Sequence, residues 1–444
     1  MVQYAYDIMD RVTNISWRTT SGATLGGFAY AYDAVGRITS RSHALGDPSQ
    51  PSPMSQSSQK TYAYDDLDRL ASDGGVAYTY DAAGNRMTRT EDGETITYTL
   101  GAGDRLASYG RAASTMPPHS GAYTHDAAGN VTRIERDGRP TLDLAWNSQY
   151  QLGSVSTNGV FAESYTYDAL GRRVTTITLE GTTRHVYDNN WQVVADIDEQ
   201  GSVVASYVWG EGVDKLLAVT IGGATYYALT DIQGTVWGYV DSQNNVVACW
   251  QYDAWGNVVD EYVAASAAPL ASIRYRFQGR EWSAATGLIN FRMRWYDAEM
   301  GRWLSKDPIG LSGGLNLYAF CDDDPTGKKD PLGLCDSKKQ KPKIKVDVPN
   351  GLLESIKTTL PEGALDVVGR TASATAVGTA KTTAQTLGAV PDVARIVMAA
   401  KDIKAMTELL AEDPEKAIES KHQQLESREK SLRDKLRDFF TRGK

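Results

Sequence analysis

The sequence contains little cysteine and little histidine. Its 444 residues hold 3 Cys, at Cys249, Cys321 and Cys335, and only 5 His. A sparse, odd set of cysteines excludes a disulfide framework, and the spacing fits no zinc site. We therefore expect no metal and no cofactor.

Long apolar runs are also missing. No stretch reaches the roughly 18 to 20 apolar residues that a membrane-spanning helix needs. Asp7 interrupts the N-terminal segment, where a Sec-type signal peptide would need an apolar core. We expect export, where it occurs, to use another route or an N-terminal region that this chain lacks.

Positive charge is in deficit as well. The formal net charge is -9 and the sequence pI is near 5.2. This balance argues against a protein that coats nucleic acid, so we expect no nucleic-acid partner for the main body of the chain. Glycine and tyrosine are abundant, with 41 Gly and 24 Tyr against 7 Phe, which indicates many turns and many amphipathic strand positions.

One motif of the type "YAYDAVGRI" recurs through the first 330 residues. Where the spacing is regular it is about 20 to 22 residues, which is typical of stacked repeats. The clear copies begin at Tyr4, Tyr30, Tyr62, Tyr78, Tyr123 and Tyr165, and looser copies begin at His185 and Trp250.

Each copy predicts a β-hairpin. Tyr-x-Tyr places two rings on one face of a strand. The Asp bonds forward to the backbone of a turn, and the Gly that follows adopts a positive φ. Because a single hairpin is marginally stable, we expect the copies to pair edge to edge in a long antiparallel ribbon that must curl.

This pattern resembles the YD repeats of the Rhs family and of the related C components of insecticidal toxin complexes. In that family the ribbon spirals into a hollow β-cocoon. The resemblance implies a mainly β fold, an antiparallel ribbon of hairpins that curls into a partial shell. The residue pattern of the tail predicts that a mostly α-helical C-terminal domain follows. It also implies that the chain corresponds to the C-terminal part of a larger protein, or to a reduced gene. We divide it into repeats (1–273), a core module (274–334) and a variable tail (335–444).

The core module carries the most specific resemblance. It contains "YRFQGRE", "TGLINFRMRWYD", "GRWLSKDPIGL" and "LNLYAF" in the order of the Rhs-associated core, and it ends on the motif P-x4-D-P-x-G-L. One departure is "CDDDP", where the family usually carries an Asn-Asn-Pro-like segment. The residues that match the terminal motif are Pro325, Asp330, Pro331, Gly333 and Leu334.

The resemblance implies that this module cuts its own chain after Leu334, at the Leu334–Cys335 bond, by chemistry like that of an aspartic protease. Two close carboxylates share one proton, so that one acts as a base and the other as an acid. The candidates are Asp307 and Asp330, each followed by Pro, with Arg302 as a possible source of positive charge. The competing aspartates are Asp297, Asp322, Asp323 and Asp324.

Two other interpretations of these residues stay open. Each Asp-Pro can be a turn opener with no chemical role. Cleavage would free the amino group and thiol of Cys335, which suggests a thiol nucleophile. We favour a variable junction residue instead, because no histidine lies near Cys335 in the sequence.

The tail reads as mostly helical and offers no recognisable catalytic set. Residues 371–390 contain one charge, Lys381, and carry small residues four apart, which lets membrane helices pack. A soluble helix, a membrane-active helix and an unrecognised enzymatic toxin stay open, and of the two toxic activities we favour the membrane-active one.

The family also implies partners and a location. These are a cognate immunity protein that binds 335–444, secretion-apparatus or chaperone proteins, often of type VI secretion, and a target membrane. Exposed tyrosine rows would permit carbohydrate binding. We expect synthesis in the bacterial cytoplasm and delivery to the outside or the cell surface in interbacterial competition. The alternative is a displaced remnant, a structural or surface-binding repeat protein without an active toxin.

Overall fold

The computed structural model describes residues 1–19, 21–45, 58–111 and 119–334. The repeats and the core module belong to one compact unit, Met1–Lys341. The predicted helical domain 335–444, and with it Cys335, lies outside the described residues.

The repeat region is a succession of strands joined by short turns. Strands β1 to β12 are β1 (Val2–Tyr6), β2 (Val12–Arg18), β3 (Thr24–Tyr32), β4 (Ile38–Leu45), β5 (Ser58–Tyr64), β6 (Leu70–Asp73), β7 (Val76–Tyr80), β8 (Arg86–Glu91), β9 (Glu94–Gly101), β10 (Arg105–Arg111), β11 (Ser120–His125) and β12 (Val131–Arg136). Strands β13 to β24 are β13 (Leu142–Trp146), β14 (Leu152–Thr157), β15 (Val160–Tyr167), β16 (Arg173–Thr178), β17 (Gly181–Tyr187), β18 (Val193–Ile197), β19 (Val203–Trp209), β20 (Leu216–Ile221), β21 (Ala224–Thr230), β22 (Val236–Val240), β23 (Val246–Tyr252) and β24 (Val258–Val263).

These strands form a single antiparallel ribbon in chain order. Each strand pairs with the one before it and the one after it, from β1 to β24. Within the described part of the chain, β1 pairs only with β2 and β24 only with β23, so the sheet does not close. The prediction of a mainly antiparallel β fold is confirmed.

The repeat motif builds its turn as predicted. Asp33 Oδ1 accepts the backbone N–H groups of Val35 at 3.1 Å and Arg37 at 2.8 Å, and its Oδ2 accepts the Arg37 Nε–H at 2.6 Å. Gly36 has a φ of 94°. In the first copy Asp10 stands at this position with a φ of 58°, which Asp tolerates better than most residues.

The motif also joins each repeat to its neighbour. The second tyrosine of a copy reaches back across the sheet: the Tyr32 hydroxyl donates to the Val12 carbonyl at 2.6 Å. The Arg11 guanidinium of the preceding turn lies 4.7 Å from the Tyr32 ring centroid, within cation–π range. The same two contacts recur between Tyr64 and the Ile38 carbonyl and Arg37. Tyr, Asp and Arg therefore act together as a connector between hairpins.

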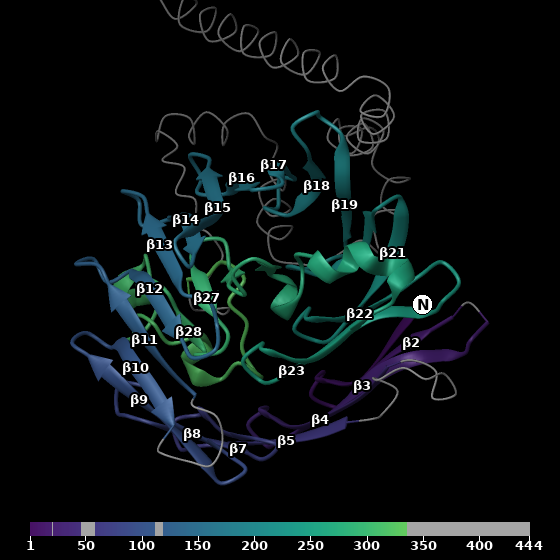
Figure 1. Ribbon diagram of the computed structural model, residues 1–444. Helices are drawn as coiled ribbons and strands as arrows, with labels where there is room; N and C mark the ends of the chain where they lie inside the picture. Colours follow the sequence, from purple (N-terminus) through teal and green to yellow (C-terminus); the bar gives the residue numbers. More distant parts are fainter. Residues whose placement is uncertain (20, 46–57, 112–118, 335–444) are drawn as a thin grey trace, which may run out of the picture. The chain divides into compact units, whose positions relative to one another are not determined.

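The core module packs against the inner face of this ribbon. It contains β25 (Glu281–Trp282), β26 (Ile289–Asn290), β27 (Trp295–Asp297) and β28 (Arg302–Trp303). Among the described residues, four 3-10 helices precede or flank these strands: η1 (Ala265–Ser272), η2 (Phe277–Gly279), η3 (Gly310–Ser312) and η4 (Cys321–Asp323). β27 and β28 lie inside the curve that the repeat strands follow (Figure 1). One core cluster joins Phe28 of β3 to Phe320 of the module, and a second joins Tyr98 of β9 to Trp295. The repeats thus supply an enclosing wall for the module.

Candidate self-cleavage site

Arg294 stands at the centre of the site. It directly precedes β27, and its side chain is 1% exposed. Its guanidinium carbon lies 4.1 Å from the ring centroid of Trp303, the last residue of β28, which holds the planar group in place. The guanidinium also donates to the Leu317 carbonyl at 3.3 Å.

The structure brings Asp307 and Asp330 to this one guanidinium. Arg294 Nη2 lies 3.0 Å from Asp307 Oδ2 and 3.3 Å from Asp330 Oδ2. Both carboxylates are nearly inaccessible, with exposed fractions of 2% and 1%. The two aspartates named from the sequence are therefore neighbours in a buried site, although they come from segments that are separated in the chain.

Asp307 is held by the backbone around it. Its N–H donates to the Leu317 carbonyl at 3.1 Å, and its Oδ1 accepts the Ile309 N–H at 3.0 Å. Burial raises the pKa of the Asp307 carboxyl, the Arg294 charge opposes that rise, and the charge of Asp330 adds to it. Asp307 is therefore the carboxyl in this site that holds a proton more readily than an exposed aspartate does.

Asp330 lies directly beside the predicted cut. Its Oδ1 accepts the Leu334 N–H at 2.9 Å, and its carbonyl accepts the Gly333 N–H at 3.3 Å. The segment from Asp330 to Leu334 is thus a tight turn closed by the aspartate itself. Gly333 has a φ of 68°, and a Cβ there would lie 2.7 Å from the Phe291 carbonyl oxygen, so the position requires glycine.

Two buried glutamines hold the chain that leads into this turn. Gln233, between β21 and β22, donates from Nε2 to the carbonyls of Pro325 at 2.7 Å and Thr326 at 2.9 Å. Gln278 donates to the Lys328 carbonyl at 3.1 Å. The motif prolines are therefore fixed in an ordered segment, and Pro331 likewise has its carbonyl bound by arginine side chains.

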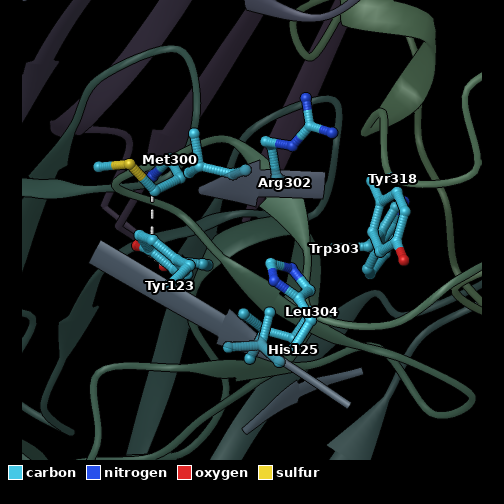
Figure 2. A pocket seen from close by; sticks show the side chains of 10 residues that line it. Tyr123, His125, Met300, Arg302, Trp303, Leu304 and Tyr318 are labelled. Carbon is cyan, nitrogen blue, oxygen red and sulfur yellow. Dashed lines mark hydrogen bonds between the residues drawn. The ribbon is translucent and has the colours of Figure 1, made fainter. Parts of the chain in front are cut away.

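Arg302 is placed elsewhere. Its Nη1 donates to Asn85 Oδ1 at 3.0 Å, and its Nη2 donates to the Asp104 carbonyl. It lines a small pocket with His125 and Tyr318 (Figure 2). Burial lowers the pKa of Arg302 to about 10. The positive group beside the two carboxylates is Arg294, and the sequence offered no sign of which arginine it would be.

The competing aspartates have other partners. Asp297 binds Arg136 and accepts the Tyr123 hydroxyl at 2.7 Å. Asp322 pairs with Lys328 at the surface, at 3.0 Å. Asp324 accepts the Gly327 N–H at 2.9 Å.

Asp323 is the competing aspartate whose carboxyl pKa is raised furthest. Its exposed fraction is 5%, and burial raises the pKa of its carboxyl to about 7, against the opposing charges of Arg86 and Arg302. The charges that face Asp323 are those of Arg86 and Arg302, whereas Arg294 pairs with Asp307 and Asp330. Of the aspartates considered from the sequence, Asp307 and Asp330 are the two that share a buried cation.

Among residues 1–19, 21–45, 58–111 and 119–334, no group of three or more His, Cys, Asp or Glu side chains could hold a metal ion. Over those ranges no helix has the length and hydropathy to cross a membrane. Cys249 and Cys321 are both buried.

The repeat region matches a known family model. The teneurin YD-shell model matches residues 2–326, which covers the repeats and most of the core module. The match extends over far more than half of the chain, so it establishes the family.

Individual relatives agree with this assignment. The tRNA3(Ser)-specific nuclease WapA of Bacillus spizizenii is 30% identical over 268 residues, 58% of this chain and 11% of its own length. The double-stranded DNA deaminase toxin A of Burkholderia cenocepacia is 28% identical over 353 residues, 72% of this chain and 21% of its own length. This chain therefore spans a small part of these relatives.

A solved structure has the same fold. The TcdB2-TccC3 complex superposes with a TM-score of 0.57 at 21% identity, over 75% of this chain and 18% of that chain. At this identity the likeness shows the fold alone. Together with the matching family model and the toxin relatives, it establishes that the chain belongs to the teneurin YD-shell family and is a shell region of the Rhs toxin type.

Proposed function

We propose that this chain cuts its own backbone between Leu334 and Cys335 by aspartic-type chemistry. The observation that carries the proposal is the sharing of one buried guanidinium by Asp307 and Asp330, with Asp330 also bonded to the Leu334 amide. A buried pair of carboxyls beside a backbone turn is an arrangement suited to peptide hydrolysis.

Charge balance assigns the roles. Two ionised carboxylates and one arginine would leave a net negative charge in a buried site, which is costly. One proton on the pair makes the site neutral, and the raised pKa of Asp307 supports that carboxyl as the one that carries it. Ionised Asp330 then accepts a proton from the attacking water, while Asp307 donates its proton to the Leu334 carbonyl oxygen. Asp330 then donates the proton it took from water to the leaving nitrogen, and Asp307 takes a proton back from a hydroxyl group of the intermediate. Collapse of the intermediate breaks the C–N bond and yields a carboxylic acid on Leu334, which ionises, and a free amine on Cys335.

We propose further that the cut releases residues 335–444 as an effector in competition between bacteria. Two relatives whose names give different activities, a nuclease and a deaminase, match this chain. That diversity fits a common shell with different effectors. From its sequence we favour a membrane-active effector over a catalytic one. The producing cell would then need an immunity protein for the tail, and delivery would need a secretion system.

The test compares the wild type with Asp307→Asn and Asp330→Asn by intact mass. Each substitution keeps the shape of the side chain but replaces the carboxyl group with an amide, which cannot act as an acid or a base in the pH range where a carboxyl titrates. Asp143→Asn is the matched control, because Asp143 forms an exposed ion pair with Arg133, 2.7 Å away, and lies outside the site. We expect two fragments that meet at Leu334 in the wild type and the control, and a single 48.4 kDa chain in the two site variants.

Other outcomes would change the account. An uncut wild type would favour the remnant without an active module. Cleavage in both site variants would assign the cut to another protease. A comparison of membrane potential in cells that produce the wild type or Asp330→Asn tests the effector: depolarisation should require cleavage.

A further inference from the structure

Three successive carbonyls before the predicted cut are bound by three successive residues of the module. The Pro331 carbonyl accepts Arg292 Nη1 at 2.5 Å, the Leu332 carbonyl accepts the Met293 N–H at 3.1 Å, and the Gly333 carbonyl accepts Arg294 Nε. The donors and the acceptors advance together along the two segments. The donor segment therefore fixes the position of each of the three residues in the acceptor segment.

The donor residues stand on a rigid turn. Phe291 N–H donates to the Arg294 carbonyl at 2.9 Å, which closes the turn between β26 and β27. The Arg292 N–H donates to Asn290 Oδ1 at 3.1 Å, and Arg292 has a φ of 68°. A left-handed residue other than glycine is strained and persists only where its surroundings hold it. The turn is thus built to present its donors in one arrangement.

A repeat residue fixes the arginine that begins this series. Asp214, between β19 and β20, binds Arg292 through both carboxylate oxygens, at 2.7 and 3.1 Å. The same carboxylate lies 3.3 Å from Arg280 Nη1, which also donates to the Pro331 carbonyl at 3.1 Å. Asp214 is 2% exposed. Because it is buried and bidentate, its pairing with Arg292 is strong and directional.

The contacts that these donors make with Pro331, Leu332 and Gly333 all reach main-chain carbonyl groups. None of them depends on the side chain of Leu332 or Leu334, and Gly333 has none. Contacts to carbonyl groups recognise the position of a peptide unit in the series and are indifferent to the residue type. The peptide bond to be cut can therefore be selected by its distance in residues from the bound carbonyl groups, independently of the side chains beside it.

We infer that Asp214, Arg280, Arg292, Met293 and Arg294 form a register clamp that selects the peptide bond to be cut. The clamp holds the backbone from Asp330 onward, so the cut falls after the fourth residue that follows Asp330, whatever side chains flank it. Asp214 is a positioning residue in this scheme, contributed to the module by the repeat wall. The inference rests on the proposed self-cleavage.

The first test inserts one glycine between Gly333 and Leu334 in the full chain. The clamp then holds the inserted glycine at the fourth position, so intact mass should show a cut between it and Leu334. A glycine inserted after Leu334 should leave the cut directly after Leu334. Leu334→Ala and Cys335→Ser should be cut at the unchanged position. If the chain with glycine inserted between Gly333 and Leu334 stays uncut, or is still cut between Leu334 and Cys335, the clamp is refuted.

The second test is Asp214→Ala, with Asp143→Ala as the control for loss of an ion pair. We expect cleavage at least tenfold slower with fragment ends at more than one bond, and an unchanged dependence of the rate on pH, because the two carboxyls remain in place. A single end at the wild-type rate overturns the role of Asp214. An uncut wild type would instead refute the self-cleavage itself, so the two failures are distinguishable.

Discussion

Gly333→Ala should slow self-cleavage more than it harms the fold. Gly333 has a φ of 68°, where alanine costs about 1 to 2 kcal/mol relative to a right-handed residue. Its Cβ would also lie 2.7 Å from the Phe291 carbonyl oxygen and 3.1 Å from the Arg294 amide nitrogen. Both neighbours are backbone atoms of the turn that carries Arg294, so the bound segment must move away from the site.

Gly287→Ala is the matched control for this change. Gly287 lies in the same module with a φ of 73°, and a Cβ there would meet nothing within 4 Å. The Gly287→Ala substitution therefore carries the conformational cost of a left-handed alanine without a steric clash. The difference in cleavage rate between the two variants isolates the effect of displacing the segment before the proposed cut from Arg294.

The magnitude follows from that difference. Forcing an extra methyl group into a packed site costs about 1 to 3 kcal/mol, and each 1.4 kcal/mol in the barrier is about tenfold in rate. We expect Gly333→Ala to cleave about 10- to 100-fold more slowly than the wild type, and Gly287→Ala to cleave at nearly the wild-type rate. Both variants should lose about 1 to 2 kcal/mol of unfolding free energy, because each places an alanine in a left-handed backbone conformation. This loss is measured with Asp330→Asn also present, so that the chain stays uncut.

The assay is the fraction of cut chain against time after synthesis, read by intact mass. Equal rates for Gly333→Ala and the wild type would refute the close approach of this turn to Arg294. Equal slowing in both glycine variants would assign the effect to general destabilisation.

Three further predictions concern pH and the arginines. The cleavage rate should fall as the pH rises through the raised pKa of Asp307, because the proton that this carboxyl donates is then lost; a rate that rises there would reverse the roles. Burial lowers the pKa of His185 to about 4 in the folded chain, below the value of about 6.5 expected in the unfolded chain. Between these two pH values the unfolded chain binds a proton that the folded chain does not. The unfolding free energy should therefore fall by about 3 kcal/mol as the pH falls through that window. His185→Gln should weaken this acid dependence in urea unfolding. Arg302→Gln should cost about 2 kcal/mol of stability yet leave the chain cleavable, whereas Arg294→Gln should leave it uncut; the reverse order would restore the assignment made from the sequence.

The hairpins could be predicted from the sequence because their determinants are local. Asp33 and Arg37 are four residues apart, and the carboxylate binds both the backbone and the side chain within one turn. The link from Arg11 to Tyr32 was not predicted, because it depends on how consecutive hairpins stack. The helical domain 335–444 stays a prediction.

The candidate site could be predicted only in part. The family motif named Asp307 and Asp330, and each lies next to a proline that limits its backbone. The choice of Arg302 over Arg294 could not be made from spacing, since both lie in arginine-rich, aromatic segments of the module. Asp214 and Gln233 come from distant hairpins. The fold alone brings Gln233 to the segment before the proposed cut and Asp214 to Arg292, which holds that segment.

The most direct test of self-cleavage is synthesis of the chain in a reconstituted translation system that contains no protease. We expect two fragments divided after Leu334, formed at a rate that does not change on dilution because the chain cuts itself. Asp330→Asn should stay whole in the same reaction. A wild-type chain that stays whole, or one whose cleavage slows on dilution, would contradict self-cleavage within one folded molecule.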